Sequence, residues 1–171
     1  MLRFGLTALE QGPVETSATV APGDPLFQGL DITLSEPLRI TGQLSLAGPD
    51  SYFWRGALAT TVSGACRRCL APASQQVKVP VNILFTEDDQ SDDPSVYVIE
   101  PHATKLDLSE AVREEFILGA PKYVLCREDC AGLCPHCGKD LNEGPHDCAA
   151  KPADPRWTAL EALKRRESGN T

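Results

Sequence analysis

The stretch Leu38-Arg-Ile-Thr-Gly-Gln-Leu-Ser-Leu46 alternates apolar and polar residues along most of its length. The same alternation returns in Val77-Lys-Val-Pro-Val-Asn-Ile-Leu-Phe85, and a rougher form covers residues 52–64. A period of two is typical of half-buried antiparallel strands. Pro80 has no N–H to donate, so its strand is expected at a sheet edge or at a bulge. Residues 1–85 are therefore predicted to be β-rich, with the Gly- and Pro-rich residues 10–30 forming a loop around short strand pieces.

One helix is predicted after these strands, from Asp107 to Gly119. The Asp107 carboxylate can cap it, and Glu110 three residues later completes the pattern of a capping box. Gly119 and Pro121 are expected to end it. Residues 86–95 carry five carboxylates and no basic residue, which predicts a solvated loop before a short strand at 96–99. The apolar residues that recur at helical spacing, and that we expect to pack on the sheet, are Leu108, Ala111, Val112 and Phe116.

The fold class predicted from these patterns is α+β: an antiparallel, β-rich, barrel- or sandwich-like domain with one central helix, a Cys-rich zinc-binding loop and a short C-terminal helix. The predicted divisions are a β-rich domain over 1–125 with the helix at 107–119, a Cys-rich segment over 126–150, and a linker with the C-terminal helix over 151–171. Asp154-Pro155 is typical of a helix start. Trp157, Leu160 and Leu163 would share one face of that helix.

Composition restricts the classes of function. Of 171 residues, 42% are hydrophobic and 23% charged, a globular mixture. Sixteen basic residues against 24 acidic ones give a net charge of −8, which argues against a general nucleic-acid coat. No apolar run approaches the ~20 residues of a membrane span, and the first residues do not resemble a signal peptide. We therefore expect a cytoplasmic protein without a membrane partner, in which clustered cysteines indicate metal or redox chemistry rather than disulfides.

The cysteine spacing is the strongest chemical signal in the chain. Two C-x-x-C pairs occur, and one tight turn of this kind lets two thiolates bind the same zinc ion. Seven cysteines and one histidine supply eight donors, enough for two four-coordinate sites, so one or two zinc ions are predicted. The preferred division places Cys66, Cys69, Cys126 and Cys130 in one site, and Cys134, Cys137, His146 and Cys148 in the other. His136 and His102 are expected to be surface residues rather than ligands.

A redox function is the rival interpretation. Arg67 and Arg68 could lower the pKa of a neighbouring thiol and make it reactive. However, the pair does not open a helix after a strand, and the same arginines would offset the charge of a thiolate-bound zinc. The patterns of zinc deaminases, P-loops and nucleophile elbows are missing from the sequence, so no enzyme and no small-molecule substrate are predicted. The basic residues that could contact RNA are Arg67, Arg68, Lys164, Arg165 and Arg166.

Four motifs, in this order, resemble the bacterial YceD family of large ribosomal RNA subunit accumulation proteins, which also has plastid members. They are Gly64-Ala-Cys-Arg-Arg-Cys-Leu70, Asp107-Leu-x5-Glu-Glu115 with Pro121, Gly132-Leu-Cys-Pro-x-Cys-Gly138 with Leu141-Asn142, and Asp154-Pro-Arg-Trp-x2-Leu-x2-Leu-Lys164. The resemblance is firm from Gly64 onward and weaker over residues 1–60. His146 departs from it, because relatives often carry Cys there. Some relatives lack the second Cys cluster, which suggests that this cluster is a structural addition.

The resemblance implies a non-enzymatic role in 23S rRNA accumulation and in assembly of the large ribosomal subunit. Its partner would be a ribosomal protein, an assembly factor or pre-rRNA. The acidic charge of the chain favours a basic protein as that partner, with at most a small RNA contact near Arg67, Arg68 and the C-terminal helix. The alternative is a thiol-based redox protein or a zinc-dependent regulator.

Overall fold

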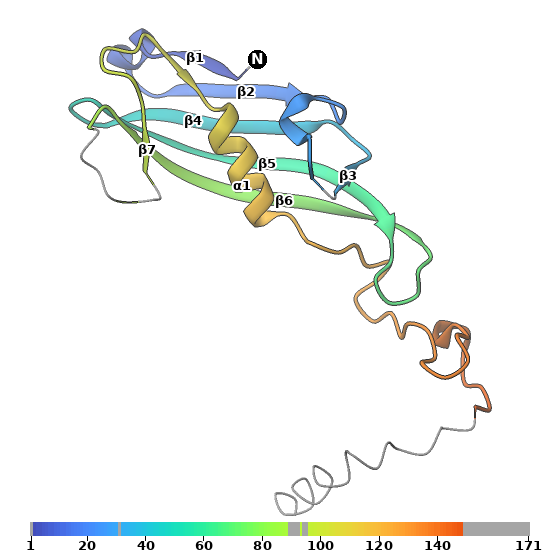
Figure 1. The fold of residues 1–171 in the computed structure, drawn as a ribbon. Helices are drawn as coiled ribbons and strands as arrows, with labels where there is room; N and C mark the ends of the chain where they lie inside the picture. Colours follow the sequence, from blue (N-terminus) through green and yellow to red (C-terminus); the bar gives the residue numbers. More distant parts are fainter. Residues whose placement is uncertain (1, 31, 89–92, 94–95, 149–171) are drawn as a thin grey trace, which may run out of the picture. The chain divides into compact units, whose positions relative to one another are not determined.

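The computed structural model describes residues 2–30, 32–88, 93 and 96–148. Its main feature is a twisted sheet in which long, curved strands lie side by side, with one helix across one face (Figure 1). A two-stranded sheet pairs β1 (Arg3–Gly5) with β8 (Lys105–Asp107). The strand order of the main sheet is β2 (Val14–Val20), β4 (Leu38–Gly48), β5 (Ser51–Ala65), β6 (Pro72–Thr86) and β7 (Val96–Val98), and β3 (Thr33–Leu34) pairs with β5 beyond the end of β4.

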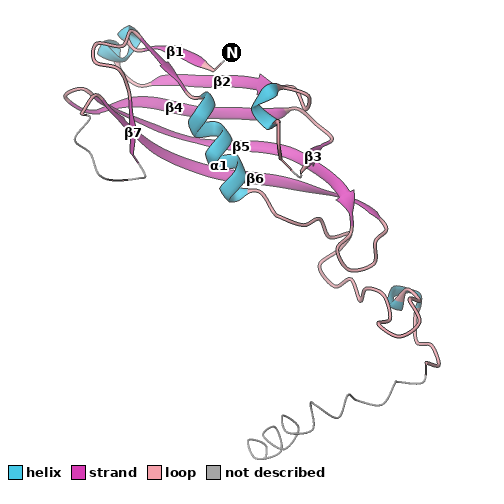
Figure 2. Cartoon of the chain, in the orientation of Figure 1, coloured by secondary structure: helices cyan, strands magenta, loops and turns pink. Residues whose placement is uncertain are grey.

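The predicted β meander is confirmed by the pairing of β4, β5 and β6, which are antiparallel neighbours along most of their length (Figure 2). The period of two is clearest in β6, where every second side chain from Val77 to Phe85 is buried. Pro80 lies opposite Ala57 of β5, in a part of β6 that has no second neighbour within the described chain, since β7 pairs only with residues 84–86. The edge position predicted for Pro80 is therefore correct. The pairing of β6 with β7 is parallel, so the sheet is mixed.

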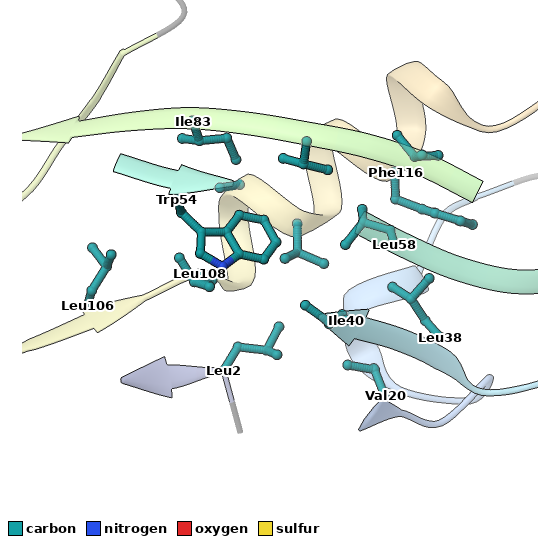
Figure 3. Close-up of a cluster of buried hydrophobic side chains, with 14 of the residues drawn as sticks. Leu2, Val20, Leu38, Ile40, Trp54, Leu58, Ile83, Leu106, Leu108 and Phe116 are labelled. Carbon is teal, nitrogen blue, oxygen red and sulfur yellow. The ribbon is translucent and has the colours of Figure 1, made fainter. Parts of the chain in front are cut away.

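The helix α1 (Ser109–Gly119) covers the apolar face of the sheet. Its buried residues are Ala111, Val112 and Phe116, as the helical spacing predicts. Phe116 meets Phe27 edge to face, with ring centroids 5.8 Å apart, and Gly119 packs so closely on Val79 that a Cβ there would stand 2.3 Å from a valine methyl carbon. Figure 3 shows the resulting cluster, in which Leu38, Ile40, Leu58 and Ile83 of the sheet lie around Trp54 with Leu108 and Phe116.

Trp54 is the largest fully buried side chain among the described residues. Its position explains why two neighbouring positions of the sheet are glycines. Gly42 and Gly56 are paired across β4 and β5. A Cβ on Gly42 would stand 2.6 Å from the carbonyl oxygen of Arg55 and 2.9 Å from Nε1 of Trp54, and a Cβ on Gly56 would stand 2.9 Å from the indole ring. The indole nitrogen donates a 2.8 Å hydrogen bond to Oγ1 of Thr16, which satisfies its only polar atom.

Three details of local structure differ from the sequence prediction. The helix begins at Ser109 rather than Asp107. The Asp107 carboxylate nevertheless accepts from the backbone N–H of Ser109 at 2.9 Å, so it satisfies an N–H at the helix start, as predicted. Residues 10–30 were predicted as a loop around short strand pieces, and residues 14–20 within them form one regular strand, β2, along β4. Leu46, at the end of the alternating stretch, is 54% exposed and lies where the pairing of β4 with β5 shifts register.

The described strands have an open order from β2 to β7, so the barrel- or sandwich-like part of the fold prediction is not confirmed. Most of the acidic segment 86–95 and the whole predicted C-terminal helix, with Trp157, Leu160 and Leu163, lie outside the described residues. The chain divides into two compact units between Cys130 and Ala131, a division that falls inside the predicted 126–150 segment. In the described part of the chain, no helix is long and apolar enough to cross a membrane.

Candidate metal centres

The loop between β5 and β6 is a tight turn that directs two thiols to the same side. The backbone N–H of Cys66 donates to the carbonyl of Ala71 (2.8 Å), and the N–H of Leu70 donates to the carbonyl of Cys66 (2.9 Å). Leu70 accordingly adopts a positive φ of 62°, which is uncommon for a residue with a branched apolar side chain. Cys66 and Cys69 are both buried.

The second C-x-x-C pair folds into the same turn. The N–H of Cys134 donates to the carbonyl of Lys139 (2.8 Å), and the N–H of Gly138 donates to the carbonyl of Cys134 (2.9 Å). Gly138 has a φ of 77°, at the position equivalent to Leu70. The two loops therefore share one hydrogen-bonding pattern, in which glycine supplies the left-handed residue without strain in the second loop only.

The first thiol cluster consists of Cys66 and Cys69 from the hairpin loop with Cys126 and Cys130 from the segment after α1. The four sulfur atoms lie within 4.8 Å of one another. The Sγ atoms of Cys66 and Cys130 are 3.9 Å apart, and those of Cys69 and Cys126 are 3.7 Å apart. The cluster thus joins the sheet to the segment that follows the helix.

Backbone contacts hold these two segments together beside the cluster. The N–H of Arg67 donates to the carbonyl of Val124 (3.0 Å). The Arg68 guanidinium donates from Nη1 to the carbonyls of Glu128 (2.8 Å) and Cys130 (2.9 Å). Arg68 therefore orders the loop that presents Cys126 and Cys130, which agrees with a structural use of this arginine.

The second cluster lies within the second unit and consists of Cys134, Cys137, His146 and Cys148, whose donor atoms also lie within 4.8 Å of one another. Sγ of Cys134 is 3.7 Å from Sγ of Cys148, and Sγ of Cys137 is 3.3 Å from Nε2 of His146. Within residues 131–148, no side chain belongs to the hydrophobic core. The order of this unit comes from hydrogen bonds, such as the one from the N–H of Ala131 to the Asn142 side chain (2.8 Å), and from a short 3₁₀ turn, Leu141–Glu143, capped by Asp140.

The distances between the donor atoms fit tetrahedral coordination of a metal ion better than a disulfide bond. Two thiolates bound tetrahedrally to one zinc at about 2.3 Å lie about 3.8 Å apart, and a thiolate and an imidazole nitrogen lie about 3.6 Å apart. The sulfur pairs at 3.7 and 3.9 Å match the first value, and the Cys137–His146 pair at 3.3 Å is close to the second. A disulfide would need about 2.05 Å. Both groups could therefore hold a metal ion.

The thiol pKa values follow the same geometry. The backbone N–H of Cys69, followed by that of Cys126, lowers the pKa of Cys66 to about 6. In the second cluster, the N–H groups of Cys137 and His136 lower the pKa of Cys134 to about 6. A hydrogen bond with Cys134, and then burial, raises the pKa of Cys148 to about 11. The lowered pKa values favour the thiolate forms of Cys66 and Cys134, whereas Cys148 keeps its proton at neutral pH. A divalent cation would displace the proton of Cys148, so metal affinity falls as the pH falls.

The structure brings together all eight sequence-predicted donors, in the two predicted groups. The spare histidines are exposed, as expected, with His102 at a positive φ of 61°. Arg67 and Arg68 lie on the surface beside the first cluster, whereas Lys164, Arg165 and Arg166 lie outside the described residues. Sequence reasoning missed Tyr123, whose ring lies 3.7 Å from the Arg67 guanidinium carbon. The sequence did offer one signal for it: a basic residue and an aromatic residue, Lys122 and Tyr123, stand next to each other between the predicted helix and Cys126.

Cys148→Ser is expected to disturb the second unit alone. The variant should increase amide hydrogen exchange over residues 131–148 and lower the zinc content, because residues 131–148 contribute no side chain to the hydrophobic core that could replace a lost ligand. The unfolding midpoint of the sheet domain should stay within about 2 °C of the wild type. Hydrogen-exchange mass spectrometry with metal analysis would measure both effects. Unchanged exchange in this segment, in a variant that has lost metal, would contradict the expectation.

The fold and the two clusters define a class: a β-sheet domain whose hairpin thiols join a post-helix segment, followed by a small Cys- and His-rich unit. The chain belongs to the family of large ribosomal RNA subunit accumulation proteins, YceD, whose model matches residues 54–164. The family resemblance of the sequence motifs is thereby confirmed.

The chain is also similar to curated proteins of bacteria and of a plant, of which the plant protein carries the family name. An uncharacterised protein of Mycobacterium tuberculosis is 33% identical over 116 residues, which cover 66% of this chain and 56% of the relative. The Bacillus subtilis protein YlbN is 26% identical over 144 residues, covering 80% of each chain. A maize protein named large ribosomal RNA subunit accumulation protein YCED homolog 1, chloroplastic, is 25% identical over 166 residues, covering 80% of this chain and 52% of the relative. The chain thus spans just over half the length of the mycobacterial relative. No solved structure matches the chain significantly.

Proposed function

We propose that this protein is a zinc-stabilised, non-enzymatic factor that promotes 23S rRNA accumulation and large ribosomal subunit assembly. Family membership carries the proposal, supported by the printed name of the maize relative. The proposed place of action is the cytoplasm. The proposed partner is a ribosomal protein, an assembly factor or pre-rRNA of the large subunit.

The donor sets support zinc in a structural role. Each cluster offers four protein ligands, and a structural zinc site is closed in this way, whereas a catalytic site keeps one position open for water. Thiolate-rich ligands favour zinc over magnesium or calcium. Zinc in the first cluster would hold the hairpin loop against the segment after α1. Zinc in the second would supply folding free energy to residues 131–148, which contribute no side chain to the hydrophobic core.

Depletion of the chromosomal gene tests the role. The expected result is a lower ratio of 23S to 16S rRNA and fewer large subunits in sucrose gradients, both restored by the wild-type chain. A Cys66→Ser/Cys69→Ser chain should restore neither, because it lacks the first cluster, whereas Lys78→Gln on the sheet should restore both. An unchanged rRNA ratio after complete depletion would overturn the proposed role.

The thiol-based alternative rests on the lowered pKa of Cys66 and Cys134. The two proposals differ in what purified protein contains. A structural zinc protein holds one or two zinc ions per chain and keeps its thiols under mild oxidant, whereas a thiol switch is metal-free and forms disulfides reversibly. Metal analysis with thiol counting decides between them.

A further inference from the structure

Three cations and an exposed tyrosine line a groove of about 440 Å³ on the first unit, beside the β5–β6 loop. A neighbouring hollow of about 230 Å³ shares part of this lining and adds the apolar side chains of Ile32 and Val62. Among the described residues, no carboxylate lines either hollow, although the whole chain carries a net charge of −8. The groove is thus a positively charged patch on a protein whose net charge is negative. Its lining residues are Arg67, Arg68, Pro121, Lys122, Tyr123 and Leu125.

Tyr123 has the properties of a stacking platform. Its side chain is 53% exposed, and the Arg67 guanidinium carbon lies 3.7 Å from the ring centroid. Within the described part of the chain, neither Arg67 nor Lys122 forms an ion pair with a carboxylate. An aromatic ring flanked by cations is the arrangement with which proteins bind unpaired nucleic acid, since bases stack on the ring and phosphates contact the cations.

The platform is ordered before any ligand arrives. Pro121 restricts the backbone at the start of the segment. The hydrogen bond from the N–H of Arg67 to the carbonyl of Val124 fixes the segment to the hairpin loop, and the thiol cluster closes the same connection at Cys126. A platform that is already ordered loses little conformational entropy on binding. Arg68 is occupied by the Glu128 and Cys130 carbonyls and therefore acts as a positioning residue.

We infer that this groove binds a short stretch of unpaired RNA, with a base stacked on Tyr123 and phosphates contacting Arg67 and Lys122. The choice of RNA rests on the proposed function. An acidic peptide would satisfy the two cations but would make no use of the part of Tyr123 that stays exposed beside Arg67. Two phosphate contacts make the binding local and dependent on salt, which is compatible with an acidic chain.

Fluorescence anisotropy with a labelled short oligouridine and the full-length chain at low salt tests the inference. Tyr123→Ala should weaken binding about tenfold, and Tyr123→Phe should retain it, because the phenyl ring still stacks. Arg67→Gln and Lys122→Gln should each reduce the slope of log affinity against log salt by about 0.7. Lys105→Gln in β8 is the matched control, with the same charge change outside the groove and an affinity equal to that of the wild type. Zinc content and unfolding midpoint identify the folded variants.

Three results would overturn the inference: no binding to oligouridine by the wild-type chain, an equal loss in Lys105→Gln and Lys122→Gln, or no effect of Tyr123→Ala. Tyr123-independent binding of a poly-glutamate probe in the same groove would assign it to an acidic protein instead. The rRNA ratio in depleted cells separates this inference from the proposed function. If the wild-type chain restores that ratio but does not bind oligouridine, the groove inference fails and the proposed function stands.

Discussion

Cys69→Ser is expected to remove one zinc ion per chain and to lower the unfolding midpoint of the sheet domain by about 10 °C or more. The Cys69 sulfur lies 3.7 Å from that of Cys126, so the substitution cuts the connection between the hairpin loop and the segment after α1. A serine hydroxyl is a poor ligand for zinc, and three thiols would remain crowded together without their cation. Metal analysis and thermal unfolding followed by circular dichroism measure the two losses.

The matched control is Cys148→Ser, which removes one thiol from the other cluster. It should leave the midpoint of the sheet domain nearly unchanged, because its partners, such as Cys134 at 3.7 Å, lie within the second unit. Chelation of the wild-type chain should reproduce both effects together. Equal lowering of the midpoint by Cys69→Ser and Cys148→Ser would contradict two separate sites, and a metal-free wild type with the same midpoint would contradict any stabilisation by metal.

The sequence was most informative where one physical constraint acts alone. Alternation along β4 and β6 predicted the sheet because one face is buried under α1. The full extent of strand β2 was not predicted, because its buried positions are Thr16 and Val20, and a threonine breaks the apolar pattern. Its burial is explained only by the hydrogen bond from Trp54, 38 residues away in the chain. Side-chain pairs that are distant in sequence are not contained in local periodicity.

The cysteine groups were predictable for a similar reason. Spacing within each C-x-x-C turn fixes two donors, and counting eight donors leaves few divisions into fours. The basic groove was not predictable in this way. Arg67 and Tyr123 are 56 residues apart, and they meet where the Arg67–Val124 hydrogen bond and the thiol cluster join the post-helix segment to the hairpin loop. The cluster therefore creates a surface that neither segment carries alone.

Trp54→Ala is expected to lower the free energy of unfolding by about 3–5 kcal/mol. The indole is fully buried between the sheet and Leu108, and its removal leaves a cavity that the β backbone cannot close. Gly42 and Gly56 approach the ring because they lack a Cβ, so no neighbouring side chain is present there to move into the space. Chemical denaturation monitored by circular dichroism measures the change.

A second variant of Trp54 separates the contributions of packing and of hydrogen bonding to this loss of stability, and a substitution at an exposed leucine is the control. Trp54→Phe keeps most of the ring volume but leaves Thr16 Oγ1 without the indole donor at 2.8 Å, and should lower the free energy of unfolding by less than Trp54→Ala. Leu46→Ala, at a side chain that is 54% exposed, should change it by no more than about 0.5 kcal/mol. Trp54→Ala as mild as Leu46→Ala would show that Trp54 does not support the packing between helix and sheet. Trp54→Phe as severe as Trp54→Ala would instead place the stabilisation in the bond to Thr16, and with it the attachment of β2 to the core.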